Sequence, residues 1–488
     1  MAAERNVSLT ALLRRLPRAE IRDDRERAIA AVEIDSRRVR AGTLFVALRG
    51  SHTDGHFYLA DAVANGAVAL VVEAAPANIP PNVTVVRVED SYRALSALAA
   101  AFYGDPSHDL DVIGVTGTNG KTTTTRMVAA ILGRAGVRCG VVGTVGAELG
   151  SRNWRLENTT PLPPTLHRLL AEMRDDGAQA VAMEVSSHAL ALDRVDDVRF
   201  RIAALTNVTR DHLDFHRTHA SYAAAKRRLF DLAPSCVLNA DDPCGARWAV
   251  ELGREGREVM TYGASVGAMV APRDIVVEPQ GTRFTIDGER FDLQVPGRFN
   301  VWNAAAAIAI ARLLGIADAT SAGGLGSLAR VPGRMERLGA DGVDVVVDYA
   351  HTPDALESAL RSLRETTRGA LAVVFGCGGD RDRGKRSEMG AVAAKLADRL
   401  YLTSDNPRTE EPQTIVDEIV AGIGSAGRTI EIDRRRAIER AIRDARPGDV
   451  VLIAGKGHET YQVIGDRVEP FDDAQVARTA LAARGVPR

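Results

Sequence analysis

Short apolar runs alternate with longer helical stretches along most of the chain. The runs are rich in Val and Ile and are bounded by glycine or polar residues, which is typical of strands buried on both faces of a parallel sheet. They include residues 140–145, 181–185, 343–347 and 450–454. Ala- and Leu-rich stretches at 91–102 and 303–314 predict helices, with Ser91 and Asn303 as their N-caps. Strand, turn and helix in repetition predict the α/β fold class with parallel sheets.

Two turn-rich breaks interrupt this pattern. Tyr-Gly-Asp-Pro-Ser occupies residues 103–107, and Val-Pro-Gly-Arg occupies residues 331–334. They predict three domains of ordinary size, at residues 1–107, 108–331 and 332–488.

A glycine-containing loop follows the apolar strand at residues 112–116. Its sequence is Gly117-Thr118-Asn119-Gly120-Lys121-Thr122-Thr123. Backbone N–H groups of such a loop, with the helix N-terminus behind it, bind phosphate. Lys121 would reach the terminal phosphates, and the Thr122 hydroxyl would bind Mg²⁺. The usual pattern has glycine where this chain has Val115, so the loop is a variant. The alternative is a strand–helix turn that binds nothing; we expect a nucleoside triphosphate site.

Polar side chains end two other predicted strands. Glu184 lies near the carboxyl end of the run 181–185, where a carboxylate suits Mg²⁺ beside a triphosphate. An ion pair with an arginine is the alternative. Asp211, His212 and Asp214 follow a further apolar run and indicate a metal or phosphate site, or else a solvated loop. Lys226 lies in a helical stretch, where its position alone does not distinguish it from an exposed lysine.

Composition narrows the function classes. Lys and Arg number 62 against 64 Asp and Glu, so a clustered cationic excess for nucleic acid is not expected. No apolar run is long enough for a membrane-spanning helix, and the first 27 residues carry charges throughout. The four cysteines have no disulfide or zinc spacing. We expect a cytoplasmic protein with reduced thiols.

Taken together and in order, the motifs resemble those of the Mur ligase family over essentially the whole chain. They are Asp35-Ser36-Arg37, the loop at 116–123, Asn158-Thr159-Thr160-Pro161, 183–190, Asp211-His212-Leu213-Asp214, Ala225-Lys226, 296–300, 331–336, 348–353, 375–386, Asp405-Asn406-Pro407-Arg408 and 455–459. The resemblance implies a central phosphate-loop ATPase domain with a parallel sheet, preceded by a domain for a UDP-linked substrate. It also implies a Rossmann-like C-terminal domain for an amino acid.

The resemblance also implies a reaction. ATP phosphorylates the D-glutamate γ-carboxylate of UDP-MurNAc-L-Ala-D-Glu, and the amine of an amino acid attacks the resulting acyl phosphate. Two Mg²⁺ ions are implied, one held by Thr122 and Glu184 and the other by His212 and a carbamylated Lys226. Lys121, His212 and Lys226 are the implied catalytic residues. Carbamylation by CO₂ would turn the Lys226 ammonium into an anion that can face a metal.

The family also supplies expectations for substrate contacts. ATP is expected to be bound by the loop 117–123 together with Asn300, Asn303, Arg334 and Asp348. For Asn300 and Asn303, helix capping is the alternative. The UDP-linked dipeptide is expected at Ser36, Thr159, Thr160, Ser186 and Arg194, with uridine near Ser36 and His52 to His56. Leu192 occupies a place where the family often has Gln.

The amino acid is expected to be meso-diaminopimelate. Relatives that add it carry Asp-Asn-Pro-Arg, as at 405–408, and an arginine fork grips the second carboxylate of this substrate. Its implied contacts are Arg381, Asp405, Asn406, Arg408, Gly455 and Glu459. An exposed turn arginine is the alternative for Arg408. No nucleic acid or membrane partner is expected, and the chain is expected to act as a monomer.

Three other functions are alternatives to this ligase activity. A folylpolyglutamate synthase-type ligase shares the phosphate loop but leaves the N-terminal domain and the Asp-Asn-Pro-Arg motif without a role. A Mur ligase acting at a neighbouring step fits the C-terminal motifs less well. A nucleotide-dependent switch would not need two further domains with small-molecule pockets.

Overall fold

The computed structural model describes residues 5–23, 25–50, 53–74, 79–340 and 342–484. Contacts between Cα atoms divide the chain into two compact units. The first comprises Met1–Gly114, Val137–Ala203 and Ala225–Pro234, and the second comprises Val115–Gly136, Ala204–Ala224 and Ser235–Arg488. Within the described part of the chain, no helix is both long and apolar enough to cross a lipid bilayer.

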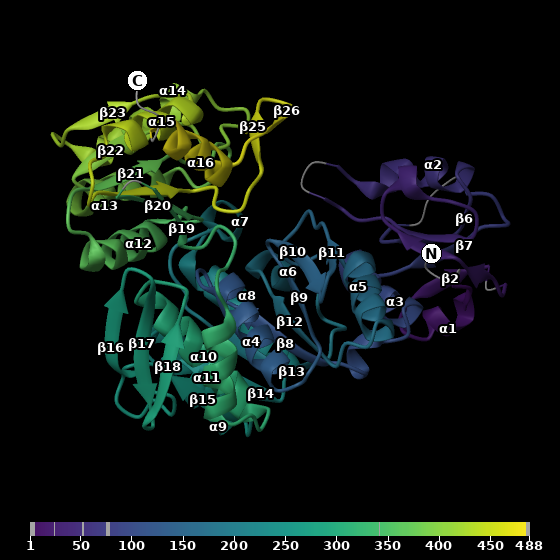
Figure 1. The fold of residues 1–488 in the computed structure, drawn as a ribbon. Coiled ribbons are helices and arrows are strands. Elements are labelled where there is room, and N and C mark those ends of the chain that lie inside the picture. The colour runs from purple at the N-terminus through teal and green to yellow at the C-terminus, as the bar shows by residue number, and fades with distance from the viewer. Residues whose placement is uncertain (1–4, 24, 51–52, 75–78, 341, 485–488) are drawn as a thin grey trace. The chain divides into compact units, whose positions relative to one another are not determined.

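The N-terminal region of the first unit is built on a five-stranded sheet (Figure 1). Its elements are β1 (Val7–Ser8), α1 (Leu9–Leu13), β2 (Glu20–Arg22), β3 (Ala28–Ile29), β4 (Ala31–Glu33), β5 (Thr43–Val46), α2 (Leu59–Ala64), β6 (Ala67–Val72), β7 (Thr84–Arg87) and α3 (Ser91–Phe102). The strand order is β2-β7-β6-β5-β4, and only β2 runs antiparallel to its neighbour. Apolar clusters with α1 and α3 on one side and α2 on the other bury both faces of the sheet.

The N-cap predicted for α3 is wrong by one residue. The helix begins at Ser91 as expected, but Asp90 caps it, because its carboxylate accepts hydrogen bonds from the backbone N–H groups of Tyr92 and Arg93. A carboxylate at this position also interacts favourably with the helix dipole.

The largest sheet has eight strands in the order β11-β10-β9-β12-β8-β13-β14-β15. Its elements and the helices around it are β8 (Asp111–Thr116), α4 (Lys121–Arg134), β9 (Cys139–Gly143), β10 (Gly146–Leu149), β11 (Arg152–Trp154), α5 (Pro163–Asp175), β12 (Ala180–Glu184), α6 (Ser187–Ala191), β13 (Phe200–Leu205), α7 (Leu213–His216), α8 (His219–Arg227), β14 (Ser235–Asn239), α9 (Pro243–Arg254), β15 (Glu258–Tyr262), α10 (Phe299–Leu313) and α11 (Asp318–Ser327). The parallel pair β9–β12 confirms the interpretation of the apolar runs at 140–145 and 181–185 as strands of a parallel sheet. Strands β14 and β15 are also parallel to each other.

A separate three-stranded sheet departs from the expected parallel pattern. It consists of β16 (Arg273–Glu278), β17 (Gly281–Ile286) and β18 (Glu289–Leu293), and all its pairs are antiparallel (Figure 1). Buried and less buried residues alternate along β17, as expected for a strand with one face toward the core.

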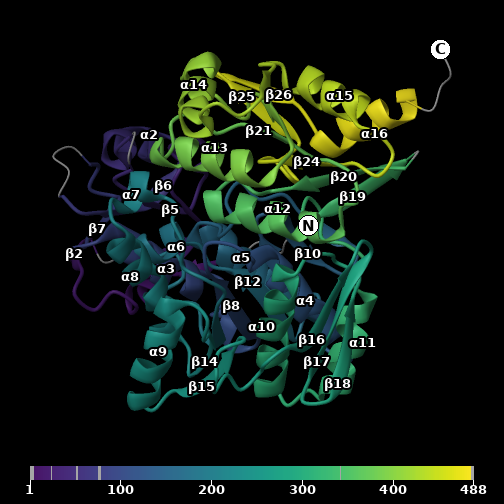
Figure 2. The same cartoon turned by 90° about the vertical axis from the view of Figure 1, so that its left-hand side faces the viewer.

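The C-terminal region is a six-stranded sheet covered by helices on both faces. Its elements are β19 (Glu336–Ala340), β20 (Val343–Asp348), α12 (Pro353–Thr366), β21 (Leu371–Phe375), α13 (Gly384–Leu396), β22 (Arg399–Leu402), α14 (Pro412–Ile423), β23 (Arg428–Ile430), α15 (Arg434–Asp444), β24 (Val450–Ala454), a hairpin of β25 (Tyr461–Ile464) and β26 (Arg467–Pro470), and α16 (Asp473–Arg484). The sheet order is β19-β20-β24-β21-β22-β23, parallel except for β19. Figure 2 shows α12 and α13 on one side and α15 and α16 on the other. The α/β fold class is therefore confirmed.

Candidate active site

The phosphate loop lies between β8 and α4 and needs glycine at two positions. Gly117 has φ +152°, and a Cβ there would lie 1.8 Å from Thr206 Oγ1. Gly120 has φ +89°, and a Cβ there would lie 2.3 Å from the side-chain oxygen of Asn303. The two glycines therefore let the loop curl against the end of β13 and against α10.

Hydrogen bonds fix the loop to the segment after β13. Asn119 N–H donates to Asn207 Oδ1 at 2.9 Å, and Thr206 Oγ1 donates to Asn119 O at 2.6 Å. Lys121 turns back on its own loop, where Nζ donates to the carbonyls of Gly117 and Thr118 at 2.8 and 2.9 Å. The Lys121 ammonium therefore lies against the backbone of the loop that would enclose a phosphate.

Arg334 and Asp348 lie beside this loop in the second unit. Arg334 Nη2 donates to Thr122 Oγ1 at 2.9 Å, and its guanidinium stacks over the ring of Tyr349 at 4.5 Å. Asp348 ends β20 and accepts from Met335 N–H at 2.8 Å. Burial raises the pKa of the Asp348 carboxyl, although the charge of Arg334 opposes this.

Asn300 and Asn303 do not cap a helix, so that alternative and the helix start predicted at Asn303 are both wrong. Helix α10 begins at Phe299, which places both residues inside it. Asn303 Nδ2 donates to Asn300 Oδ1 at 2.9 Å, and Asn300 Nδ2 donates to Pro296 O at 2.7 Å. Because these two hydrogen bonds orient both side-chain amides, the side-chain oxygen of Asn303 faces Gly120.

Asp211 and His212 form a contact at the loop after β13, while Asp214 is exposed. His212 Nε2 lies 3.3 Å from Asp211 Oδ2, and His351 Nε2 lies 3.8 Å from the same oxygen. Burial would raise the pKa of the Asp211 carboxyl, but the interaction with His351 and the charges of His212 and Lys385 hold it well below its usual range. The buried carboxylate is therefore ionised and surrounded by basic groups.

In the first unit, Glu184 accepts two hydrogen bonds from Thr144. Its Oε1 accepts from Thr144 N–H and its Oε2 accepts from the Thr144 hydroxyl, both at 2.9 Å. The Thr144 hydroxyl also lies 3.0 Å from that of Thr159. Among the described residues no arginine pairs with Glu184, so the ion-pair alternative is wrong.

Three other predicted substrate contacts lie in the same hydrogen-bond network. Thr160 Oγ1 donates to Glu184 O at 2.9 Å and accepts from Ser186 N–H at 3.0 Å. Arg194 Nη1 donates to Thr160 O at 3.2 Å. The structure thus brings Thr159, Thr160, Ser186 and Arg194 together around the carboxyl end of β12, with Leu192 at the C-cap of α6.

Lys226 is 1% exposed. Composition alone favoured an ordinary exposed lysine on a helix, and that interpretation is wrong. Thr122 and His212 lie in the second unit, whereas Glu184 and Lys226 lie in the first. Over the described ranges, no three His, Cys, Asp or Glu side chains gather as a ready-made metal centre.

The Asp-Asn-Pro-Arg motif follows β22 in the second unit. Arg408 is half-buried and Nη1 donates to Gly379 O at 2.7 Å, so it is not the exposed turn arginine of the alternative. Burial, and then the neighbouring charge of Arg381, lowers the pKa of the Arg408 guanidinium. In the part of the chain that the structure describes, neither arginine forms an ion pair with a carboxylate. Two close guanidinium groups that form no ion pair are suited to a ligand carboxylate.

Asn406 and Glu459 meet beside these arginines. Asn406 Nδ2 donates to Glu459 Oε2 at 2.9 Å, and Tyr349 OH lies 3.5 Å from Glu459 Oε1. Gly455 follows β24, and a Cβ there would lie 2.6 Å from Asp405 Oδ2. All six residues predicted to contact diaminopimelate therefore lie on loops at the carboxyl ends of β21, β22 and β24.

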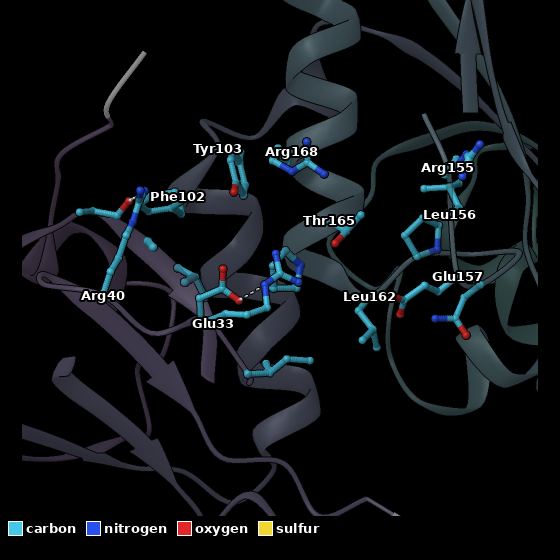
Figure 3. Close-up of a pocket in the computed structure, with 18 residues that line it drawn as sticks. Glu33, Arg40, Phe102, Tyr103, Arg155, Leu156, Glu157, Leu162, Thr165 and Arg168 are labelled. Atoms are coloured by element: carbon cyan, nitrogen blue, oxygen red, sulfur yellow. Dashed lines mark hydrogen bonds and ion pairs between the residues drawn. The ribbon is translucent and has the colours of Figure 1, made fainter. Parts of the chain in front are cut away.

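Ser36 lies in a short 3₁₀ helix, Ser36–Arg38, where its carbonyl accepts from Asn65 Nδ2 at 3.0 Å. His56 Nδ1 lies 2.6 Å from Asp54 Oδ1, and His52 lies outside the described residues. A pocket of about 690 Å³ opens between β4 and the segment 155–165 of the first unit (Figure 3). Its lining includes Arg38, Arg40, Arg155 and Arg168. Ser36 does not line it.

Sequence reasoning missed Thr144 and Lys456. Thr144 directly follows β9, whereas the strand predicted at 140–145 included it, so the end of the strand was placed two residues too late. Lys456 is buried and donates to Asn406 Oδ1 at 3.0 Å and to Glu459 Oε2 at 3.1 Å. It stands within a quoted motif, but sequence alone does not distinguish a buried lysine from a solvated one.

Comparison with known proteins agrees with this geometry. Residues 28–103 match the model described as Mur ligase family, catalytic domain; residues 115–311 match the Mur ligase middle domain; residues 333–457 match the Mur ligase, glutamate ligase domain. The chain is 44% identical to the UDP-N-acetylmuramoyl-L-alanyl-D-glutamate–2,6-diaminopimelate ligase of Geobacter metallireducens, over 93% of this chain and 94% of that protein. It is 43% identical to the ligase of the same name from Geobacillus thermodenitrificans, over 98% and 100%.

A solved structure of a protein with that ligase name superposes with a TM-score of 0.69. It is 33% identical, and the match covers 99% of this chain and 100% of the other. Identity of this level over nearly the whole length of several relatives extends through every region in which the predicted site residues lie. The chain belongs to the Mur ligase family.

Proposed function

We propose that this protein is an ATP-dependent, peptide-forming ligase of cytoplasmic peptidoglycan precursor synthesis. It joins meso-diaminopimelate to the D-glutamate γ-carboxylate of UDP-MurNAc-L-Ala-D-Glu through an acyl phosphate. The observation that carries this proposal is the pair Arg381 and Arg408, two neighbouring guanidinium groups that form no ion pair among the described residues and lie on the same sheet edge as Asn406 and Glu459. The relatives that carry 2,6-diaminopimelate in their names support it.

We assign the steps to three domains, at residues 1–107, 108–331 and 332–488. The first binds the UDP portion, the second binds ATP, and the third binds the amino acid. The three family models follow the same order and support the division. The arginine-lined pocket beside β4 suits the diphosphate of the nucleotide substrate, because guanidinium groups match phosphate oxygens in charge and geometry.

ATP lies against the loop 117–123 in this proposal. Lys121 exchanges the carbonyls of Gly117 and Thr118 for the terminal phosphates, and Arg334 adds a second cation beside Thr122. Asn300, Asn303 and Asp348 hold the nucleoside. Cations at this position stabilise the negative charge that develops as the phosphoryl group is transferred.

Two Mg²⁺ ions fit the donors available. Glu184 is a buried carboxylate whose side-chain oxygens, among the described residues, accept from the amide and the hydroxyl of Thr144, which leaves oxygen lone pairs for a hard cation. Thr122, His212 and a carbamylated Lys226 complete the proposed ligands. When bound, the ions would neutralise the charges of the triphosphate and the substrate carboxylate. The burial of Lys226 is consistent with a side chain that belongs to the site and not to the solvated surface of its helix.

The dipeptide substrate is held by Ser36, Thr159, Thr160, Ser186 and Arg194. The hydrogen bonds of Thr144 hold Glu184 and Thr159 in a fixed relative position, so the proposed metal ligand and the proposed substrate contact are positioned together. At the other end, Arg408 and Arg381 take the distal carboxylate of diaminopimelate. Asp405, Asn406, Gly455 and Glu459 receive the remainder of the distal head. We expect a monomer with no nucleic acid or membrane partner.

The test is phosphate release with ATP, Mg²⁺ and UDP-MurNAc-L-Ala-D-Glu, with meso-diaminopimelate, L-lysine or neither added. Release that requires meso-diaminopimelate is the expected result. Release with L-lysine instead would keep the ligase and reject the assigned amino acid. Release that ignores the amine would favour a nucleotide switch.

A further inference from the structure

Lys456 is a completely buried cation inside the proposed amino-acid site, and no role above uses it. It follows β24 and is 0% exposed. A buried ammonium persists only where its charge and its N–H groups are satisfied. Its partners therefore indicate what it does.

The three N–H donors of Lys456 face three side chains of the site. Nζ lies 3.0 Å from Asn406 Oδ1, 3.1 Å from Glu459 Oε2 and 3.7 Å from Asp405 Oδ1. Its Nζ also lies 5.6 Å from the centre of the Tyr461 ring. The first two distances are hydrogen bonds, and the third is an ion-pair contact.

These contacts fix the orientation of the Asn406 amide. Its oxygen accepts from both Lys456 and Val463 N–H, the latter at 3.0 Å. Its nitrogen must then point the other way, where it donates to Glu459 Oε2 at 2.9 Å. Without Lys456, the amide would lose one of the two bonds that select this orientation.

The contacts of Lys456 also orient the Glu459 carboxylate. Lys456 Nζ and Asn406 Nδ2 both donate to Oε2 of Glu459. The other oxygen, Oε1, has only the Tyr349 hydroxyl nearby among the described residues, at 3.5 Å. Oε1 can therefore accept a hydrogen bond from a ligand ammonium, close to the two arginines that can bind a ligand carboxylate. This arrangement matches a zwitterionic amino-acid head.

We propose that Lys456 is a positioning residue that orients the Asn406 amide and the Glu459 carboxylate, with which the site recognises the distal ammonium of diaminopimelate. This inference rests on the proposed function. It predicts that Lys456 affects recognition of that ammonium specifically, and leaves recognition of ATP unaffected.

The test compares two amino acids in the parent and in Lys456→Met. One is meso-diaminopimelate, and the other is L-2-aminopimelate, which lacks only the distal ammonium. We expect the parent to prefer meso-diaminopimelate by at least about a hundredfold in kcat/KM, as expected for a site that hydrogen-bonds a polar substrate group. In Lys456→Met the preference should fall below about tenfold, mainly through KM, with the KM for ATP unchanged. Lys395→Met, an exposed lysine of α13, is the matched control and should keep the parent's preference.

A double variant keeps the test valid if Lys456→Met does not fold. Lys456→Met/Glu459→Gln removes one charge of each sign and should show the same preference ratio as Glu459→Gln alone, because Lys456 acts through Glu459. A further loss in the double variant, or an intact preference in Lys456→Met, would overturn the inference. A parent without diaminopimelate-dependent turnover would instead reject the proposed function, and this inference with it.

Discussion

Arg434 and Asp473 form an ion pair in which neither side chain is exposed. Arg434 Nε lies 2.8 Å from Asp473 Oδ1, and Nη2 lies 2.7 Å from Oδ2. The same guanidinium donates to Ala454 O at 3.0 Å, at the end of β24, and lies 3.4 Å from Ser404 O, just after β22. The pair therefore ties together the two strand ends from which the loops with Asn406 and Glu459 emerge.

Replacing Arg434 with Met should strongly destabilise the C-terminal region. It leaves the Asp473 carboxylate buried without its partner, a loss that typically costs about 3–5 kcal/mol. The measurement is the free energy of opening, from native-state hydrogen exchange of the β22 and β24 amides.

The double variant Arg434→Met/Asp473→Leu should recover most of that loss, because no unpaired charge remains. Arg436→Met, on the exposed face of the same helix, should exchange like the parent. Equal protection in Arg434→Met and the parent would show that the pair does not hold the strand ends.

Gly120→Ala should impair ATP binding. The substitution puts a side chain at φ +89° and brings its Cβ to 2.3 Å from Asn303 Oδ1. The loop or Asn303 must therefore move, and we expect the KM for ATP to rise at least about tenfold. The KM for the amino acid should stay unchanged.

Gly133→Ala is the matched control for this substitution. Gly133 lies in α4, has no positive φ, and has no heavy atom within 4 Å of an added Cβ. Its replacement should leave the KM for ATP unchanged and raise stability by about 0.4–1 kcal/mol. A normal KM for ATP in Gly120→Ala would contradict the role assigned to this curl.

The phosphate loop and the buried strands could be predicted from sequence because both are local. The loop at 117–120 directly follows β8 and leads into α4 at Lys121, and the run at 450–454 is β24. Helix α10 starts earlier than predicted because Phe299 and Asn300 continue it toward the Pro296-Gly297 turn, so Asn303 lies inside it.

Contacts between distant segments could not be read from the chain. Thr144 reaches Glu184 across 40 positions, and Lys456 reaches Asn406 across 50. Their burial depends on strand order, which local patterns do not encode. Apolar and polar residues alternate in the sequence of β16–β18, as antiparallel strands require. This signal was missed because strands and helices alternate in the rest of the chain.

Acid should destabilise the C-terminal region partly through Glu410. The hydrogen bonds from the buried guanidinium of Arg386, at 2.7 and 2.9 Å, lower the pKa of Glu410 to about 2. A lowered folded-state pKa stabilises the fold above the unfolded value, near 4.5, and the effect is lost as pH falls to about 2. At neutral pH the ionised carboxylate therefore stabilises the fold through its hydrogen bonds from Arg386.

Glu410→Gln tests this dependence. The free energy of unfolding of this variant should lie below that of the parent at pH 7, and the difference should shrink toward zero between pH values of about 4.5 and 2. Glu411→Gln, an exposed neighbour, should follow the parent at every pH. A difference that stays constant down to pH 2 would mean that Glu410 acts through packing and not through its charge.

Arg408 should determine which amino acid is accepted. Its guanidinium is half-buried, lies beside Arg381 and forms no ion pair with a carboxylate among the residues described. Arg408→Ala should raise the KM for meso-diaminopimelate about a hundredfold, because losing one partner of a desolvated charge pair costs roughly 2–5 kcal/mol. Arg408→Lys keeps the charge but not the planar fork, so its KM should rise at least about tenfold.

The KM for ATP and the kcat distinguish this role of Arg408 from general damage to the fold. In both variants the KM for ATP should match the parent, and kcat at saturating amino acid should change much less than KM, because the arginine binds a group remote from the reacting amine. Arg428→Ala, an exposed arginine of β23, should behave as the parent throughout. The Ala variant should also discriminate less against L-lysine, since the unpaired guanidinium that rejects it is gone. An unchanged KM for meso-diaminopimelate in Arg408→Ala would refute the assignment of its carboxylate to this side chain.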